Sequence, residues 1–506
     1  MARFGRALSL AASRLRGPRL RRGAAAVLTI AGLAAGSASI AAAAGAGDGT
    51  AGSTPPTVTT LRGSGVTGWI TTADGSRRLA PVAPGEIVSG TVANATTVAI
   101  DPATRYQPID GYGGALTESS AWLVSQLPVD QRDSTLRALF DPESGAGLSY
   151  VRVALGASDF ALSAYSYDDM PPGQTDPTLA RFSVAHDDTM IVPMLREIRR
   201  INPNVRFLAS PWSAPAWMKD SGTLYGGSLN DEYLDVFARY LVKAVQAYAT
   251  RGIIFDTLTV QNEPLWSGTD YPTMMLSTLQ EATLIGSYVG PALTQLHLTT
   301  KILALDHNWE DSDYAMSVLA DTTAARYVAG TAWHCYGGDM SVQSTVHDAY
   351  PSKATYFTEC SGRDPSTDFG TNLAWNARNI LGTIHNWSRT ALLWNLAVDP
   401  SRGPHTGGCT DCRGVLTVDL GTNAVTENPE YYVLAQAAKI VVPGSIRVAS
   451  PWDPDGMSTL AFVNPDGSHA AVLYNGSASA QAVTITGAGT TFTVTVPAGA
   501  VGSYRW

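Results

Sequence analysis

Short apolar runs alternate with amphipathic segments through the middle of this 506-residue chain. Between the runs lie segments such as 234–249, where Leu234, Phe237 and Leu241 recur at helical spacing. Eight runs have the length of buried strands: 111–115, 151–155, 205–209, 257–260, 301–305, 328–332, 354–358 and 390–394. Strands that alternate with helices form parallel sheets, so the pattern predicts a closed β/α barrel over residues 101–435.

The end of the chain follows a different pattern. From residue 436 onward, apolar and polar positions alternate singly between turns rich in Gly and Ser, as in 483–486 and 492–496. We expect residues 436–506 to form a small antiparallel β-sandwich that strands from residues 58–100 complete. The predicted fold class is therefore α/β, a TIM barrel with an accessory β-sandwich.

The first 46 residues are unlike the rest of the chain. Seven arginines precede a long uncharged run of mostly Ala and Gly, which is the layout of a secretory signal peptide. A flexible linker is expected at 47–57. An uncleaved membrane anchor is the alternative, but Ala and Gly drive membrane insertion weakly. We expect a secreted, extracellular protein with no stable membrane insertion.

Charge narrows the range of partners. Without the leader the chain has 27 basic and 43 acidic residues and a net charge of −16. Such a surface does not attract nucleic acid, whose phosphates require a basic patch. A neutral carbohydrate or glycoconjugate fits better, and nothing in the sequence indicates an oligomeric state.

The chain has four cysteines. Cys409 and Cys412 form a C-x-x-C in a Gly-rich loop, which we interpret as a local disulfide; a thiol pair or half of a metal site are the alternatives. No second C-x-x-C or pair of histidines has the spacing of a zinc site, so we predict no metal and no other cofactor. Cys335 and Cys360 are expected to be small, buried and unpaired.

Polar residues follow nearly every predicted barrel strand, and the strand ends meet at the mouth where such barrels have their active sites. Two of them are glutamates: Glu263, after the fourth strand, and Glu359, after the seventh. Glycoside hydrolysis needs one carboxyl to protonate the leaving oxygen and another to attack the anomeric carbon. We predict that Glu263 and Glu359 are this pair, and that the anionic Glu359 raises the pKa of Glu263 so that it stays protonated.

Several segments, taken together, resemble glycoside hydrolase family 30, the family of the lysosomal glucosylceramidases and their bacterial relatives. These segments are 109–118, 150–153, 156–160, 209–219, 261–264, 358–361 and 393–396. The resemblance implies that Glu263 is the general acid/base and that Glu359 is the nucleophile of a glycosyl-enzyme intermediate. It also implies substrate-binding roles for Glu118, Trp212, Asn262, His334, Tyr336 and Trp394, with Asn262 on the sugar 2-hydroxyl and Tyr336 holding Glu359.

The chain departs from the lysosomal relatives at three places: Glu118 stands for Asp, Cys335 stands for Trp, and the loop 407–414 is unlike theirs. These departures affect the expected sugar or aglycone, not the reaction.

Some residues also have structural alternatives. Trp394 could fill the core, as we expect of Trp217; His334 could cap its strand; Arg152 and Asp159 could form an ion pair below the site; Asp306 and His307 could bind substrate or order a loop.

The sequence therefore predicts a retaining β-glycoside hydrolase that acts on β-glucosides by double displacement. A β-1,6-glucanase and a β-xylosidase would share both glutamates and are the near alternatives. A non-catalytic carbohydrate-binding protein is the alternative from another class, and loss of either glutamate would be its mark in the sequence.

Overall fold

The computed structural model describes residues 65–363 and 368–506. The expected leader (1–46) and linker (47–57) lie outside these residues. Within the described ranges, no helix combines the length and the apolar content that crossing a bilayer requires.

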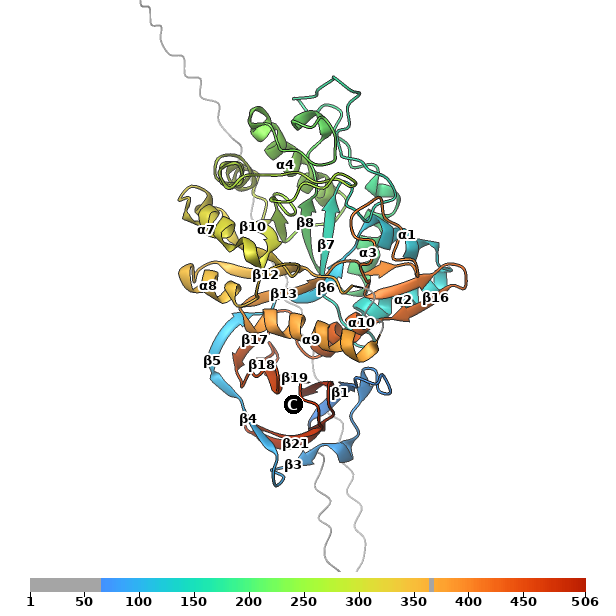
Figure 1. Ribbon diagram of the computed structural model, residues 1–506, viewed down its shortest axis with the longest axis vertical. Coiled ribbons are helices and arrows are strands. Elements are labelled where there is room, and N and C mark those ends of the chain that lie inside the picture. The colour runs from blue at the N-terminus through green and yellow to red at the C-terminus, as the bar shows by residue number, and fades with distance from the viewer. Residues whose placement is uncertain (1–64, 364–367) are drawn as a thin grey trace, which may run out of the picture. The chain divides into compact units, whose positions relative to one another are not determined.

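Eight parallel strands close into a barrel, which confirms the predicted fold class (Figure 1). Each predicted run corresponds to one of them, with ends that differ by a few residues. In chain order the strands are β6 (Gly111–Ala115), β7 (Tyr150–Leu155), β8 (Arg206–Pro211), β9 (Thr257–Thr259), β10 (Lys301–Asn308), β11 (Val328–His334), β12 (Ala354–Glu359) and β13 (Ser388–Leu393). The ring closes where β13 pairs with β6.

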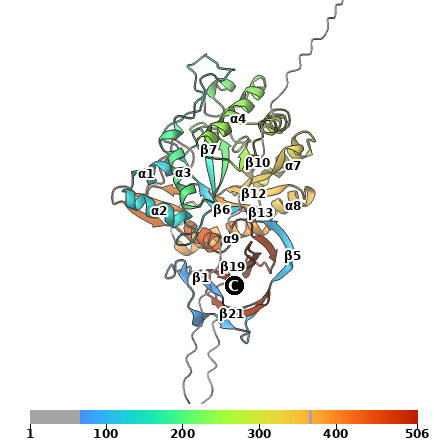
Figure 2. The ribbon, with the colours of Figure 1, turned by 180° about the vertical axis from the view of Figure 1, so that it is seen from behind.

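Helices surround the barrel on its outside, as both ribbon views show (Figures 1 and 2). The predicted helix 234–249 is α4 (Leu234–Thr250), which buries Phe237, Leu241 and Val245. The others are α1 (Glu118–Gln126), α2 (Val129–Phe140), α3 (Ile191–Ile201), α5 (Thr278–Thr283), α6 (Gly290–Gln295), α7 (Ser312–Ala320), α8 (Val342–Ala349), α9 (Phe369–His385) and α10 (Pro429–Ala438). A π-helical turn (Leu284–Val289) joins α5 to α6.

The barrel interior changes from apolar to polar toward the mouth. One buried cluster across the barrel consists of Tyr150, Leu208, Leu303, Ala332, Tyr356 and Leu392. Because side chains alternate between the two faces of a strand, the next inward positions lie two residues further on. In five of these strands those positions hold Arg152, Ser210, His334, Thr358 and Trp394. The strands thus bring the expected site residues together at one end of the barrel.

Most of the remaining strands in the described residues form a sandwich of two sheets. The larger sheet has the order β2 (Ala80–Pro81), β1 (Thr67–Thr71), β22 (Val501–Arg505), β19 (His469–Asn475), β18 (Met457–Val463), β17 (Ile446–Ala449) and β5 (Asp101–Pro108). The smaller sheet has the order β3 (Val88–Ser89), β21 (Thr490–Val496), β20 (Gln481–Gly487) and β4 (Thr96–Ala99). Because β5 belongs to the sandwich, the barrel begins after Pro108 and not at residue 101.

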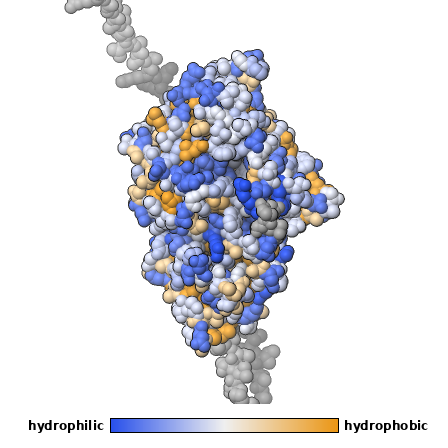
Figure 3. Space-filling model, in the orientation of Figure 1, coloured by the Kyte–Doolittle hydropathy of each residue, from blue (hydrophilic) through white to orange (hydrophobic). Residues whose placement is uncertain are grey.

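A third sheet consists of β14 (Ala397–Val398), β15 (Leu416–Asp419) and β16 (Ala424–Glu427). Its first two strands enclose the loop that carries Cys409 and Cys412. On the face shown in Figure 3, apolar residues gather in small patches separated by hydrophilic ones.

Candidate active site

A buried arginine, Arg152, lies at the centre of the mouth. Its Nη1 donates a hydrogen bond to Oε2 of Glu359, and its Nη2 donates to Oδ1 of Asn262 (2.8 Å) and Oδ2 of Asp306 (2.7 Å). The side chains of Arg152 and Asp306 are fully buried. Removing one partner of a buried ion pair typically costs about 3–5 kcal/mol, so this network fixes Glu359 and Asn262 relative to the barrel.

His334, at the end of β11, connects the second glutamate to the same network. Its Nε2 lies 3.1 Å from Oδ1 of Asp306 and its Nδ1 lies 3.1 Å from Oε1 of Glu263. The hydroxyl of Tyr336 donates to Oε1 of Glu359 at 2.9 Å. Each glutamate therefore has fixed partners from neighbouring strands.

Backbone irregularities direct both glutamates into the mouth. Glu263 has φ 46°, a left-handed conformation that costs a non-glycine residue about 1–3 kcal/mol. Its amide donates to the Asp306 carbonyl (2.9 Å), which holds it there. The ladder between β11 and β12 shifts register after Trp333, so that His334 pairs with Glu359. Such irregularities re-aim side chains beside active sites.

The two carboxylates lie close together. Oxygens of Glu263 and Glu359 and a ring nitrogen of His334 are all within 4.8 Å of one another. Retaining glycosidases place their carboxylates about 5–5.5 Å apart, whereas inverting enzymes need about 6.5–9.5 Å to admit a water molecule. The separation fits the retaining geometry.

A cavity of about 500 Å³ opens over this pair. One wall is aromatic: Trp212 and Trp394 stack with ring centroids 5.0 Å apart, and the Arg152 guanidinium lies 4.7 Å from the Trp212 ring centroid. The rest of the lining is Asp159, Asn262, Glu263, Trp266, Asp270, Tyr271, His307, Asn308, Tyr336, Glu359, Arg363, Gly408, Cys409, Thr410, Asp411 and Cys412. Flat apolar faces beside hydrogen-bonding groups suit a sugar ring, which has both kinds of surface.

Comparison with known proteins decides the family. The sequence model of the "Glycosyl hydrolase family 30 TIM-barrel domain" matches residues 109–441, and that of the family's "beta sandwich domain" matches residues 444–504. The chain belongs to glycosyl hydrolase family 30. This family 30 chain is a retaining β-glycoside hydrolase, which confirms the resemblance and the predicted reaction and removes the non-catalytic alternative.

Individual relatives of this family 30 hydrolase fall into two groups. It is 35% identical over 438 residues to an "Endo-1,6-beta-D-glucanase" of Neurospora crassa, covering 81% of this chain and 89% of the relative. It is 29% identical over 391 residues to the "Lysosomal acid glucosylceramidase" of Mus musculus, covering 72% of this chain and 74% of the relative. Among solved structures, "The endo-beta1,6-glucanase BT3312" has a TM-score of 0.82 and 32% identity, covering 87% of this chain and 99% of the other.

Most predicted site residues of the hydrolase meet in the cavity. Trp212, Asn262, Tyr336 and Trp394 line it with the two glutamates, so Trp394 is not merely core filling. His334 lies behind the wall, fully buried between Glu263 and Asp306, and does not simply cap its strand.

Glu118 is the exception: it does not line the cavity. Its carboxylate accepts a hydrogen bond from the Leu162 amide (2.9 Å) and lies 2.6 Å from Nε2 of His186. As the first residue of α1, after its cap Thr117, it points toward the segment that follows β7. It therefore orders that segment, and the expected contact with substrate stays a prediction.

Asp159, in the segment after β7, does line the cavity. The expected ion pair between Asp159 and Arg152 is not formed, because Arg152 binds Asp306 and Glu359 instead. Burial, reinforced by the charges of Glu359 and Glu263, raises the pKa of Asp159 well above its usual range. One feature of the sequence indicated this network: Arg152 is a charged residue at an inward position of an apolar strand.

The structure also decides between the alternatives left open for Asp306, His307 and Trp217. Asp306 is fully buried and also accepts from Thr259 and Thr358 (both 2.7 Å), so it orders the site rather than binding substrate. His307 lines the cavity, with Nε2 3.9 Å from Oε1 of Glu263. Trp217 lies outside the cavity lining; it packs edge-on against Tyr233.

All four cysteines form disulfides. Cys409 pairs with Cys412, as interpreted from the sequence. Cys335 pairs with Cys360, which corrects the expectation that both are unpaired. They follow the ends of the adjacent strands β11 and β12, where their Cα atoms are 5.2 Å apart. Their separation of 25 residues in sequence hid this proximity.

The electrostatics reverse the expected order of the two glutamates. Burial raises the pKa of Glu263, but the hydrogen bond and charge of His334, with His307 and Arg152, outweigh it and hold the pKa below its usual value. Burial dominates at Glu359 and raises its pKa, although His334 and Arg152 oppose the rise. The sequence could not show that a histidine cation lies against Glu263.

His334 carries this positive charge at neutral pH. Burial alone lowers its pKa, but the charge of Glu359 and the hydrogen bonds to Asp306 and Glu263 raise it to about 9. Glu263, His334 and Glu359 are the one group within the described residues whose spacing suits a metal ion. A protonated imidazole has no free lone pair for a metal, however, so the cluster suits proton transfer better.

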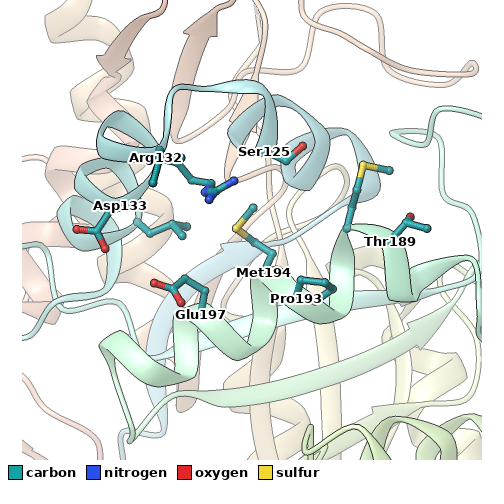
Figure 4. A pocket seen from close by; sticks show the side chains of 10 residues that line it. Ser125, Arg132, Asp133, Thr189, Pro193, Met194 and Glu197 are labelled. Atoms are coloured by element: carbon teal, nitrogen blue, oxygen red, sulfur yellow. The ribbon is translucent and has the colours of Figure 1, made fainter.

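A second cavity, of about 400 Å³, lies outside the barrel between α1, α2 and α3 (Figure 4). Arg132, Asp133 and Glu197 lie at one end of it and Met194 points into it. Arg200 pairs with both acids. These acids are neutralised and far from the strand ends, so this cavity offers no arrangement for glycoside cleavage.

Proposed function

We propose that this hydrolase cleaves β-1,6-linked glucan, with Glu359 as the nucleophile and Glu263 as the general acid/base. The pair of carboxylates within 4.8 Å at the barrel mouth supports the double displacement. Arg152 and Tyr336, the two donors that orient Glu359, support its role as nucleophile. The linkage rests on similarity, because the relatives at 35–38% identity are described as endo-1,6-β-D-glucanases.

In the first step, an oxygen of Glu359 attacks the anomeric carbon. A carbon–oxygen bond to Glu359 forms, the glycosidic bond breaks, and Glu263 gives its proton to the leaving oxygen. Arg152 and Tyr336 bind different oxygens of Glu359, so they orient the carboxylate for attack. In the second step, Glu263 takes a proton from water, and the water oxygen attacks the anomeric carbon. The bond from that carbon to Glu359 breaks, and the product has the β configuration again.

The proton for the first step comes from the His334–Glu263 pair. In the empty site His334 holds this proton, because its pKa is about 9 while that of Glu263 is lowered. A bound sugar excludes water from Glu263, and desolvation favours the neutral carboxylic acid. The Nδ1–Oε1 separation of 3.1 Å is a hydrogen-bond distance, so the proton can pass to Glu263.

Three groups suit the sugar bound next to Glu359. The Asn262 carbonyl oxygen is occupied by Arg152, which leaves its amide NH₂ to donate to a hydroxyl such as the 2-OH. Asp159 offers a carboxyl group in the cavity wall, and the stacked Trp212 and Trp394 offer apolar surface. The raised pKa of Asp159 favours the neutral acid, which can both donate to and accept from sugar hydroxyls.

Hydrolysis of simple β-glucosides or glucosylceramide is the second candidate. It is favoured by the 29–30% identity to glucosylceramidases. A β-xyloside is a weaker candidate, because the xylanases with similar structures share only 17–21% sequence identity, which indicates the fold alone.

The test is turnover of β-1,6-glucan, glucosylceramide and aryl β-glucoside and β-xyloside by wild type and Glu359→Gln. The proposal expects the highest kcat/KM on β-1,6-glucan, with oligosaccharide products, and loss of all activity in the variant. Turnover of glucosylceramide without turnover of β-1,6-glucan would refute the linkage. Full activity of Glu359→Gln would refute the nucleophile.

We also infer that the protein is exported. The arginine-rich start, the uncharged run behind it and two disulfides are typical of a secreted chain. Mass analysis of protein from the culture medium would show a new N-terminus near residue 46, whereas an intact N-terminus in the cell pellet would contradict export.

A further inference from the structure

Two loops beside the cavity expose large apolar side chains. The first follows β8 and carries Tyr225; the second follows β9 and carries Leu265, Trp266 and Met275. These four side chains are 38–51% exposed, Trp266 the most. We call them the leaving-side surface.

The two loops form one rigid unit. Residues 225 and 272 pair as an antiparallel bridge, and the Met275 amide donates to the Gly227 carbonyl (2.8 Å). The buried ammonium of Lys219 donates to the carbonyls of Leu224 (2.8 Å) and Thr273 (2.7 Å), one in each loop. The exposed side chains therefore stand on a fixed backbone, which lowers the entropy cost of binding a ligand.

Trp266 lies where the surface meets the cavity. Its amide donates to the Glu263 carbonyl (2.9 Å), so a tight turn places the indole beside the acid/base. The indole lines the cavity together with Tyr271. About half of the Trp266 residue is exposed to solvent (51%), which is unfavourable for a large apolar ring in the free protein.

The position of Glu263 determines which part of the substrate the leaving-side surface contacts. The acid/base protonates the glycosidic oxygen, so the leaving group must lie on the side of Glu263. Trp266 lines the same cavity as Glu263, so a leaving group bound there can contact it. Polar groups also line this cavity: Asp270, in the same loop as Trp266, accepts from the Gly408 amide (2.9 Å), and Arg363 pairs with Asp411 (3.2 Å). Apolar side chains beside polar groups match a sugar ring better than a lipid chain.

We propose that the leaving-side surface, with Trp266 as its main contact, binds the glucosyl units on the leaving side of a β-1,6-glucan. This inference rests on the proposed function. A simple aryl glucoside has no such units, so the surface makes the hydrolase selective for chains. Trp266 determines specificity and takes no part in bond cleavage.

The test compares wild type, Trp266→Ala, Trp266→Phe and the control Tyr288→Ala. Tyr288 is a surface tyrosine, 37% exposed, on the helix that joins α5 to α6. The substrates are β-1,6-linked glucotriose, aryl β-glucoside and glucosylceramide in mixed micelles. Trp266→Ala should lose about tenfold in kcat/KM on the trisaccharide, the worth of one good stacking contact. Its loss on aryl glucoside should be clearly smaller, Trp266→Phe should recover most of the loss, and Tyr288→Ala should behave as wild type.

Each result separates the inference from the proposed function. If wild type does not cleave the trisaccharide, the proposed linkage fails. If wild type cleaves it and Trp266→Ala cleaves it equally well, the proposal that the leaving-side surface binds glucosyl units is refuted. A loss confined to glucosylceramide would refute the glucan as the ligand and indicate that the surface binds a lipid leaving group. Equal losses on all three substrates, or a lowered melting temperature, would show that Trp266 has a structural role.

Discussion

The Cys335–Cys360 disulfide joins the two strand ends that carry the nucleophile and its partners. Cys335 lies between His334 and Tyr336, and Cys360 follows Glu359 directly. Replacing both cysteines by alanine should therefore affect stability and catalysis together.

The size of the effect on stability follows from the length of the closed loop. For the separation of 25 residues, the loss of chain entropy in the unfolded state corresponds to about 3.5 kcal/mol. For Cys409 and Cys412, three residues apart, the same relation gives about 1.6 kcal/mol. The Cys409→Ala/Cys412→Ala variant is therefore a matched control with about half the expected destabilisation.

The two double variants should also differ in kcat. A displacement of Glu359 by about 1 Å can cost about a hundredfold in rate, and of the two disulfides only Cys335–Cys360 joins the strand end at Glu359. We expect kcat on aryl glucoside to fall about ten- to a hundredfold in Cys335→Ala/Cys360→Ala. The control loop lines the cavity, so its effect should fall mainly on KM.

The assay combines denaturant unfolding of the three proteins with kcat and KM on aryl β-glucoside, after thiol titration has confirmed the remaining disulfide. Equal destabilisation of both double variants, with kcat of wild type in each, would refute the reasoning. The strand ladder alone would then hold the catalytic pair.

Three further changes test individual contacts. His334→Asn removes the cation that opposes a rise in the pKa of both glutamates, so the kcat/KM–pH profile should narrow. Its acid limb should move up with the pKa of Glu359, and its basic limb, expected near pH 9 in wild type from the pKa of His334, should move down because Glu263 alone then holds the proton. An unchanged basic limb would contradict the shared proton. Tyr336→Phe removes a donor to Glu359, which should raise its pKa, move the acid limb up and lower kcat about tenfold; a profile like that of wild type would contradict the contact. Asp159→Asn should lower kcat/KM about tenfold, because an amide replaces the carboxyl group that lines the cavity. The melting temperature should stay unchanged, because the raised pKa of Asp159 favours the neutral acid and the substitution replaces it by a neutral group of the same shape; a clear loss of stability would make Asp159 structural.

The sequence predicted most of the fold because the barrel and the sandwich have distinct periodicities. Apolar runs separated by helical patterns identified all eight barrel strands, and single alternation identified some of the sandwich strands, such as β20 and β21. The strand β5 was placed in the barrel because its sequence has no apolar face, and its pairing with β17 depends on residues far along the chain.

The site was predictable where one residue type serves one role at a strand end. Glu263 and Glu359 follow their strands directly, and both reach the cavity. Interactions between distant strands were not predictable. The partners of Arg152, the cation beside Glu263 and the Cys335–Cys360 bond all depend on which strands are neighbours and on local shifts of register.

The most direct test of the central claim is proton NMR of the sugar that wild-type enzyme first releases from an aryl β-glucoside or a β-1,6-glucan. Two displacements, with Glu359 as nucleophile and Glu263 as acid/base, predict that the β-anomer appears first and then mutarotates. First release of the α-anomer would contradict the account, because a single displacement by water leaves Glu359 no role as a nucleophile.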